Sequence, residues 1–133
     1  MNNVWVNGCF DVLHVGHIQL LNYARRLGDR LIVGIDSDSR VQASKGANRP
    51  HNTAPDRRTV LLALKAVDHV VEFSSDDELA DLIRQYHPGH MVVGSDWEGH
   101  TVIGQEHAGK VVYFPRIDEY STTRTLANQR SWA

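Results

Sequence analysis

The feature that most constrains this sequence is segment 7–17, Asn-Gly-Cys-Phe-Asp-Val-Leu-His-Val-Gly-His, which directly follows the apolar run Val4-Trp5-Val6. The apolar run predicts a strand, the glycine after it predicts a tight turn, and the amphipathic residues that follow predict a helix. Gly8 stands where the backbone must bend or approach a ligand closely, and Gly16 stands where a helix packs tightly or a phosphate comes near. The segment therefore predicts a strand, a tight turn and a helix start, in that order.

Two histidines flank the second glycine of this segment. His14 and His17 are three residues apart, so a helix that begins near Leu13 carries both rings on one face of its first turn. Backbone N–H groups and the positive end of the helix dipole point the same way, which makes an anion site. Imidazoles at such a site donate hydrogen bonds to phosphate oxygens and stabilise charge that develops during phosphoryl transfer. From these two residues alone, solvated histidines or half of a metal site are equally open interpretations.

The full pattern is more specific than the two histidines. Its residues stand in the register G-x-F-D-x-x-H-x-G-H, at Gly8, Phe10, Asp11, His14, Gly16 and His17. This string resembles the motif of the cytidylyltransferase-like nucleotidyltransferases, in which it follows the first strand of a Rossmann-like domain. The resemblance implies transfer of a nucleoside monophosphate from an NTP to a phosphorylated acceptor, with release of pyrophosphate.

The length and charge of the chain limit the remaining classes of protein. Its 133 residues predict a single domain, 1–133, and a net charge of −2 without a long basic run gives no support for binding nucleic acid. The only cysteine, Cys9, excludes an internal disulfide and fits a reducing compartment, where a small buried filler is a commoner role than a nucleophile. No apolar run approaches membrane-spanning length. We therefore expect a soluble, cytoplasmic protein with no membrane partner.

Four further apolar runs predict strands, and the segments between them predict helices. The strands are expected at 31–35, 69–73, 91–94 and 111–114, and the helices at about 18–27, 36–43, 54–66 and 75–86, with a last helix ending near 129. This alternation predicts an α/β fold with one Rossmann-like, doubly wound, parallel five-stranded sheet and helices on both faces. In such sheets the ligand binds at the carboxyl ends of the strands, which singles out loop 94–99.

The family resemblance extends over essentially the whole chain, but its two halves are similar to different branches. The string 7–11, together with Lys45-Gly46, Arg49-Pro50 and Asn52, resembles the adenylyltransferase domain of bacterial ADP-heptose synthase. This half favours ATP and a heptose phosphate.

The other half resembles glycerol-3-phosphate cytidylyltransferase. The similarity rests on Asp96-Trp97-Glu98-Gly99 and on Arg116 ahead of Ser121-Thr122-Thr123. This half favours CTP, and we follow it in the choice of nucleotide. Residues 118–120 depart from both branches, which usually place a glycine shortly before the serine.

The resemblance also implies roles for single residues. His14 and His17 bind the NTP phosphates and stabilise the crowded α-phosphorus. Lys45 neutralises phosphate oxygens, with a solvated surface lysine as the alternative. Arg57, near the start of its helix, grips the pyrophosphate with a bidentate fork.

The implied nucleotide site takes the remaining motif residues. Asp96 and Arg116 are candidates for holding the base or the ribose, although surface salt bridges also use such residues. Residues 121–123 offer hydroxyls and amide N–H groups to the β- and γ-phosphates, or simply cap a helix, and Trp97 either stacks or packs. The nucleotide-binding set is Gly8, Cys9, Phe10, Asp11, Gly16, Asp96, Trp97, Arg116, Ser121, Thr122 and Thr123.

The implied chemistry needs no protein nucleophile, because the acceptor phosphate attacks the α-phosphorus in line. Mg²⁺ is the expected cofactor, bound with the NTP whose charge it offsets. No carboxylate cluster in the sequence indicates a protein-built metal site. The family resemblance also implies a homodimer.

The expected function is transfer of a nucleoside monophosphate, CMP favoured, to a small polyol or sugar phosphate such as glycerol 3-phosphate. The alternative within this class is ATP-dependent adenylylation of D-glycero-D-manno-heptose 1-phosphate. A cofactor-making adenylyltransferase acting on flavin, pantetheine or nicotinamide phosphates fits strings 7–11 and 96–99 less well. Outside the enzymes, a non-catalytic nucleotide-binding module is possible, but the intact His14, His17 and Lys45 argue against it.

Overall fold

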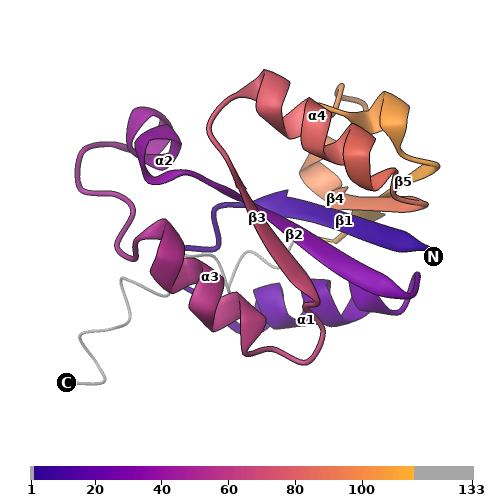
Figure 1. Ribbon diagram of the computed structural model, residues 1–133, viewed down its shortest axis with the longest axis horizontal. Helices are drawn as coiled ribbons and strands as arrows, with labels where there is room; N and C mark the ends of the chain where they lie inside the picture. Colours follow the sequence, from indigo (N-terminus) through magenta and orange to yellow (C-terminus); the bar gives the residue numbers. More distant parts are fainter. Residues whose placement is uncertain (1, 116–133) are drawn as a thin grey trace.

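The five predicted strands form one parallel sheet in the computed structural model, which describes residues 2–115. The strands pair in the order β3-β2-β1-β4-β5 (Figure 1). Their bounds are Asn3–Gly8 for β1, Arg30–Asp36 for β2, His69–Phe73 for β3, His90–Gly94 for β4 and Lys110–Phe114 for β5. The predicted fold class is confirmed. The extent of the domain, 1–133, stays a prediction because its last part lies outside the described residues.

Helices cover both faces of this sheet. They are α1 (Val15–Arg25), α2 (Asp38–Lys45), α3 (Ala54–Leu62) and α4 (Asp76–Tyr86), followed by the short 3₁₀ turns η1 (Ser95–Trp97) and η2 (Gln105–His107). Helices α1 and α3 lie on one face and α4 lies on the other (Figure 1). Among residues 2–115, no helix combines the length and the apolar character needed to cross a membrane.

Alternation along β1 divides the core into two layers. Val4 and Val6 belong to the layer under α1 and α3, whereas Trp5 belongs to the layer under α4. Because successive strand side chains point to opposite faces, Asn7 follows Trp5 onto the α4 face. The polar side chain of Asn7 therefore lies on the α4 face, near the carboxyl end of the central strand β1.

Three local expectations differ from the structure at the helix ends. Helix α1 begins at Val15 rather than near Leu13, and His14 is its N-cap. Helix α3 ends at Leu62, a turn before the predicted Ala66. Beyond it, the amides of Ala63, Leu64 and Val67 each bond the carbonyl three residues back, as in tight turns.

The third difference concerns the start of α3. Thr53 precedes the helix as its N-cap, a position that its type favours, but its side chain makes no capping hydrogen bond. The amide of Ala54 instead donates to Asp38 Oδ1 at 2.8 Å, from the first residue of α2. The cap is therefore supplied by another element, which ties the start of α3 to the start of α2.

Candidate active site

The two motif histidines form a reciprocal cap at the start of α1. The Nδ1 of His14 accepts a hydrogen bond from the amide of Gly16 at 3.1 Å, and the Nδ1 of His17 accepts one from the amide of His14 at 3.3 Å. The ring centroids are 3.9 Å apart. The predicted pairing of the two rings is therefore present, although His14 caps the helix instead of lying in its first turn.

This cap determines which nitrogen of each ring carries the proton. A neutral imidazole has one N–H, so a ring whose Nδ1 accepts a hydrogen bond is protonated on Nε2. Burial lowers the pKa of His14, and burial followed by the charges of His14 and Lys45 lowers the pKa of His17 to about 4. Near pH 7 both rings are therefore neutral, with their N–H donors on Nε2.

The ring of Phe10 packs against the ring of His17 and thereby supports the histidine pair. Its ring is 7% exposed, belongs to the core under α1 and α3, and meets the ring of His17 edge-on at 5.4 Å. A Cβ added to Gly8 would lie 3.1 Å from Cε2 of Phe10, so the glycine gives the ring room. The Phe10 side chain therefore packs in the core, and a contact of this residue with nucleotide stays a prediction.

Asp11 is also buried. Its carboxylate accepts hydrogen bonds from the amides of His51 and Asn52, both at 2.8 Å, and from Arg49 Nε at 3.1 Å. Burial by itself raises the pKa of Asp11, but these three hydrogen bonds outweigh it and hold the pKa below its ordinary value. The Asp11 side chain therefore anchors loop 46–53 to the motif loop, and a contact of Asp11 with nucleotide stays a prediction.

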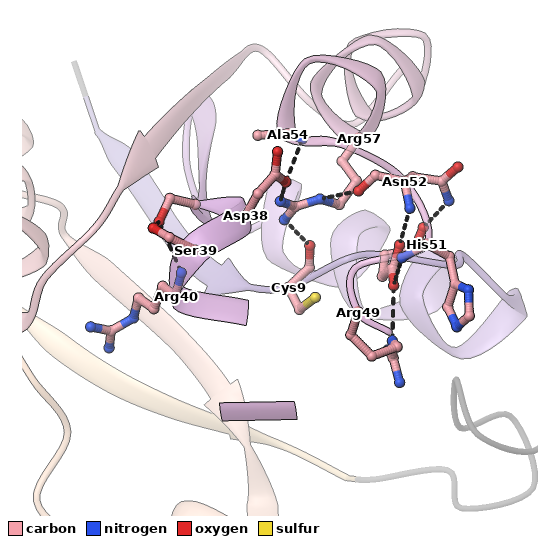
Figure 2. Close-up of polar contacts among 11 residues, drawn as sticks. Cys9, Asp38, Ser39, Arg40, Arg49, His51, Asn52, Ala54 and Arg57 are labelled. Atoms are coloured by element: carbon pink, nitrogen blue, oxygen red, sulfur yellow. Dashed lines mark hydrogen bonds and ion pairs between the residues drawn. The ribbon is translucent and has the colours of Figure 1, made fainter. Parts of the chain in front are cut away.

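Arg57, expected to bind the pyrophosphate, is buried. It is 1% exposed, and its guanidinium donates to the carbonyls of Cys9 and Asn52 and to Asp38 Oδ1 at 2.8 to 3.0 Å. Figure 2 shows the side chain enclosed between these groups. Each nitrogen of the guanidinium has an internal acceptor, and contact of Arg57 with pyrophosphate stays a prediction. Arg57 joins the motif loop, α2 and loop 46–53.

Lys45 lies at the end of α2 and is exposed. It is close enough for its charge to lower the pKa of both His17 and Cys9. For Cys9, burial is the larger effect and raises the pKa of the thiol. The structure therefore places Lys45 near the pair formed by His14 and His17. Cys9 keeps an uncharged thiol, and its backbone carbonyl accepts a hydrogen bond from Arg57.

The residues predicted to hold the base, the ribose and the β- and γ-phosphates lie only partly within the described residues. Asp96 and Trp97 lie in η1, directly after β4, and the Trp97 side chain is 49% exposed. Arg116, Ser121, Thr122 and Thr123 lie outside the described residues, so their roles stay predictions. Gly16 is described, and its amide serves the His14 cap.

A cavity of about 310 Å³ opens beside this site, at the carboxyl edge of the sheet and on the α4 face. Its lining includes Asn7 from β1, Asp36 from β2, Phe73 from β3, Trp97 from η1 and Arg40 from α2. A sequence-based search for motifs missed Asn7 as a site residue, and it missed Asp36 and Arg40 altogether. Their common signal is that Asn7 and Asp36 stand where strands end, at the edge where an open sheet binds ligands.

One further cation at this edge has an unsatisfied donor. Arg49 Nη2 is buried and has no hydrogen-bond partner among residues 2–115, although Nε of the same side chain is bonded to Asp11. A buried guanidinium nitrogen without an acceptor is unusual in a folded protein. It adds to the N–H donors that this region offers to an anion.

The described residues also show which groups are present to hold the expected Mg²⁺. Residues 2–115 contain no group of three or more His, Cys, Asp or Glu side chains placed to hold a metal ion. The donors gathered near His14 and His17 are N–H groups, which suit phosphate oxygens. Mg²⁺ therefore stays a prediction, as an ion that is carried by the phosphates of the NTP.

Comparison with known proteins identifies the relatives of this chain. A family model described as cytidylyltransferase-like matches residues 5–130. The chain belongs to this family. The resemblance based on residues 8–17 is thereby confirmed.

The curated relatives of this family member are longer proteins. The bifunctional protein HldE of Sulfurimonas denitrificans is 48% identical over 123 residues, which cover 92% of this chain and 26% of the relative. The bifunctional protein HldE of Helicobacter hepaticus is 43% identical over 129 residues, which cover 96% of this chain and 27% of the relative. The chain thus spans about a quarter of the length of these curated relatives.

Solved structures share the same fold. A lipopolysaccharide core biosynthesis protein from Thermoplasma volcanium superimposes with a TM-score of 0.68 at 26% identity, covering 91% of this chain and 99% of that chain. A pantothenate synthetase from Thermus thermophilus gives a TM-score of 0.61 at 16% identity, covering 96% of this chain and 65% of that chain. The second likeness concerns the fold alone.

Proposed function

We propose that this chain transfers AMP from ATP to a heptose 1-phosphate, releasing pyrophosphate. The observation that carries the proposal is the pair of neutral imidazoles at the start of α1, each capped on Nδ1 and therefore a donor on Nε2. Two fixed donors at a helix N-terminus suit the charge that develops on the α-phosphate during transfer. Lys45, whose charge reaches His17, neutralises further phosphate oxygens.

The reaction is a single in-line displacement at the α-phosphorus. An oxygen of the acceptor phosphate forms a new bond to that phosphorus, and the bond to the bridging oxygen of the β-phosphate breaks. The bonding pair leaves with pyrophosphate, which is already an anion and needs no proton from the protein. Positioning and charge stabilisation are therefore what the protein contributes. Mg²⁺, when bound to the triphosphate, offsets its charge.

The choice of ATP and a heptose phosphate departs from the sequence-based preference for CMP transfer to glycerol 3-phosphate. It rests on the relatives named HldE, together with the resemblance of residues 7–11 and 45–52 to the adenylyltransferase domain of ADP-heptose synthase. The structural relative described as a lipopolysaccharide core biosynthesis protein supports the same direction. The cytidylyltransferase-like string at 96–99 is the feature that favours CTP.

Pyrophosphate release measured with Mg²⁺ tests the proposal. ATP and CTP are each paired with heptose 1-phosphate and with glycerol 3-phosphate, and we expect the highest kcat/KM for ATP with heptose 1-phosphate. Preference for CTP with glycerol 3-phosphate would contradict the proposed substrates. Nucleotide binding without release from any pair would favour a non-catalytic module.

Matched variants test the role of the histidine pair. His17→Asn keeps an acceptor near the Nδ1 position but has no donor at the Nε2 position, so we expect kcat to fall by about 10²-fold or more. His87→Asn makes the same chemical change at the exposed end of α4, where His87 has a φ of 42° that asparagine tolerates. Equal activity of the two variants would contradict a role for the His17 donor.

A further inference from the structure

The cavity beside the histidine pair contains an amide with a fixed orientation. The indole N–H of Trp5 donates to Asn7 Oδ1 at 2.9 Å. An indole nitrogen is only a donor, so the amide oxygen faces Trp5 and the Nδ2 group is turned away from it. Among the described residues no partner for Asn7 Nδ2 is present, and Asn7 lines the cavity. Asn7 therefore offers two N–H donors to whatever occupies the cavity.

A glycine on the neighbouring strand makes this arrangement possible. Gly34 of β2 is the register partner of Asn7. A Cβ at Gly34 would lie 2.6 Å from Cζ2 of Trp5, a distance at which something must shift. The glycine thus lets the buried indole lie across β2 and reach the amide. The orientation of the Asn7 side chain is therefore set by residues of β1 and β2.

The charged side chains at the cavity are one cation and the two carboxylates that hold it. Arg40 donates from Nε to Asp36 Oδ1 at 2.8 Å and from Nη2 to Asp76 Oδ1 at 2.7 Å, and its guanidinium lies 5.2 Å from the ring centroid of Phe73. One cation held between two carboxylates leaves no surplus positive charge for a phosphate. Asp36 Oδ2 has no hydrogen bond within residues 2–115 and adds an acceptor to the donors of Asn7.

The size and walls of the cavity suit a sugar. The cavity volume of about 310 Å³ lies at the lower end of the range for small-molecule sites, about 300–1,000 Å³. The half-exposed Trp97 supplies aromatic surface for the C–H groups of a sugar, whereas Phe73 is buried beside Arg40. Donors, an acceptor and an aromatic ring without net positive charge are what an uncharged polyhydroxylated group requires.

We propose that this cavity binds the uncharged polyol part of the acceptor, that Asn7 and Asp36 select it by hydrogen bonds to its hydroxyls, and that Trp5 is the positioning residue for Asn7. The acceptor phosphate then lies outside the cavity, towards Lys45 and the histidine pair. This inference rests on the proposed function and goes beyond it, because it assigns the recognition of the acceptor to residues on the α4 face. It predicts better binding of a heptose 1-phosphate than of glycerol 3-phosphate.

Calorimetric binding tests the assignment without requiring turnover. Asn7→Asp keeps an oxygen for the Trp5 N–H but removes both donors, so we expect the Kd for heptose 1-phosphate to rise about tenfold or more. The Kd values for ATP and for inorganic phosphate are expected to stay within about twofold. Asn22→Asp, on the exposed side of α1, makes the same chemical change away from the cavity and is expected to leave all three Kd values unchanged.

A second variant, at a residue outside the core, separates an effect on binding from an effect on folding. Trp97→Ala removes a half-exposed ring outside the core, and it is also expected to weaken heptose 1-phosphate binding more than glycerol 3-phosphate binding. In turnover, both variants are expected to raise the KM for the acceptor with little change in the KM for ATP. A higher KM or Kd for ATP, equal losses for inorganic phosphate, or no change in acceptor binding would overturn the proposal. Absence of pyrophosphate release in the wild type would count against the proposed function alone.

Discussion

Arg57 offers a quantitative test of the internal network that holds the motif loop. In Arg57→Ala the carbonyl of Cys9 loses its 2.8 Å donor, and a buried group without a partner costs about 1–3 kcal/mol. Removing a side chain that is 1% exposed also leaves a cavity. Asp38 has a 44% exposed side chain, so water replaces much of that interaction and its share is small. We expect the free energy of unfolding to fall by about 2–4 kcal/mol.

Urea unfolding followed by far-UV circular dichroism measures this change, provided that the m-value stays constant. Arg57→Lys keeps the charge but cannot reach three acceptors with a planar fork, so an intermediate loss is expected. Arg58→Ala is the matched control, because Arg58 is the next residue of α3 and is exposed. Its effect is expected to stay within about 0.5 kcal/mol. A loss below about 1 kcal/mol for Arg57→Ala, accompanied by a higher KM for ATP, would refute the internal role and restore direct contact with pyrophosphate.

Three further outcomes follow from the same contacts. Because the folded-state pKa of His17 is lowered to about 4, the unfolded chain binds the proton first as the pH falls. The free energy of unfolding therefore decreases between about pH 6.5 and pH 4 by up to about 1.4 kcal/mol per pH unit, and urea titrations of His17→Gln should lack this share. Asp11→Asn, which weakens the anchor of loop 46–53, should cost about 1–3 kcal/mol and speed amide exchange of His51 and Asn52. Gly34→Ala should lower the melting temperature and weaken heptose 1-phosphate binding in parallel, and unchanged binding would separate Trp5 from the acceptor.

The fold was predictable because the signals for it are local. Short apolar runs bounded by polar residues indicate strands buried on both faces, and the capping residues between them mark the helix starts. The histidine pair was predictable for the same reason, since two rings three residues apart at a helix start must lie close together. Their observed centroid distance of 3.9 Å agrees with that reasoning.

The roles of Arg57 and Asp11 were not predictable, because burial is a property of tertiary structure. A sequence shows that Arg57 stands near a helix start, but it does not show that a carbonyl of the motif loop and a carboxylate from α2 converge on it. The cavity was missed for a related reason. Its polar groups come from the ends of separate strands, and no spacing along the chain links Asn7 to Asp36.

The most direct test of the central claim follows the oxygen atoms of the acceptor. Heptose 1-phosphate labelled with ¹⁸O in its phosphate is incubated with ATP, and the products are examined by ³¹P nuclear magnetic resonance. Attack of the acceptor phosphate on the α-phosphorus predicts an ADP-linked sugar with ¹⁸O in the bridge between its two phosphorus atoms, and unlabelled pyrophosphate. Label in the released phosphate or pyrophosphate, or the absence of an ADP-linked sugar, would contradict the account.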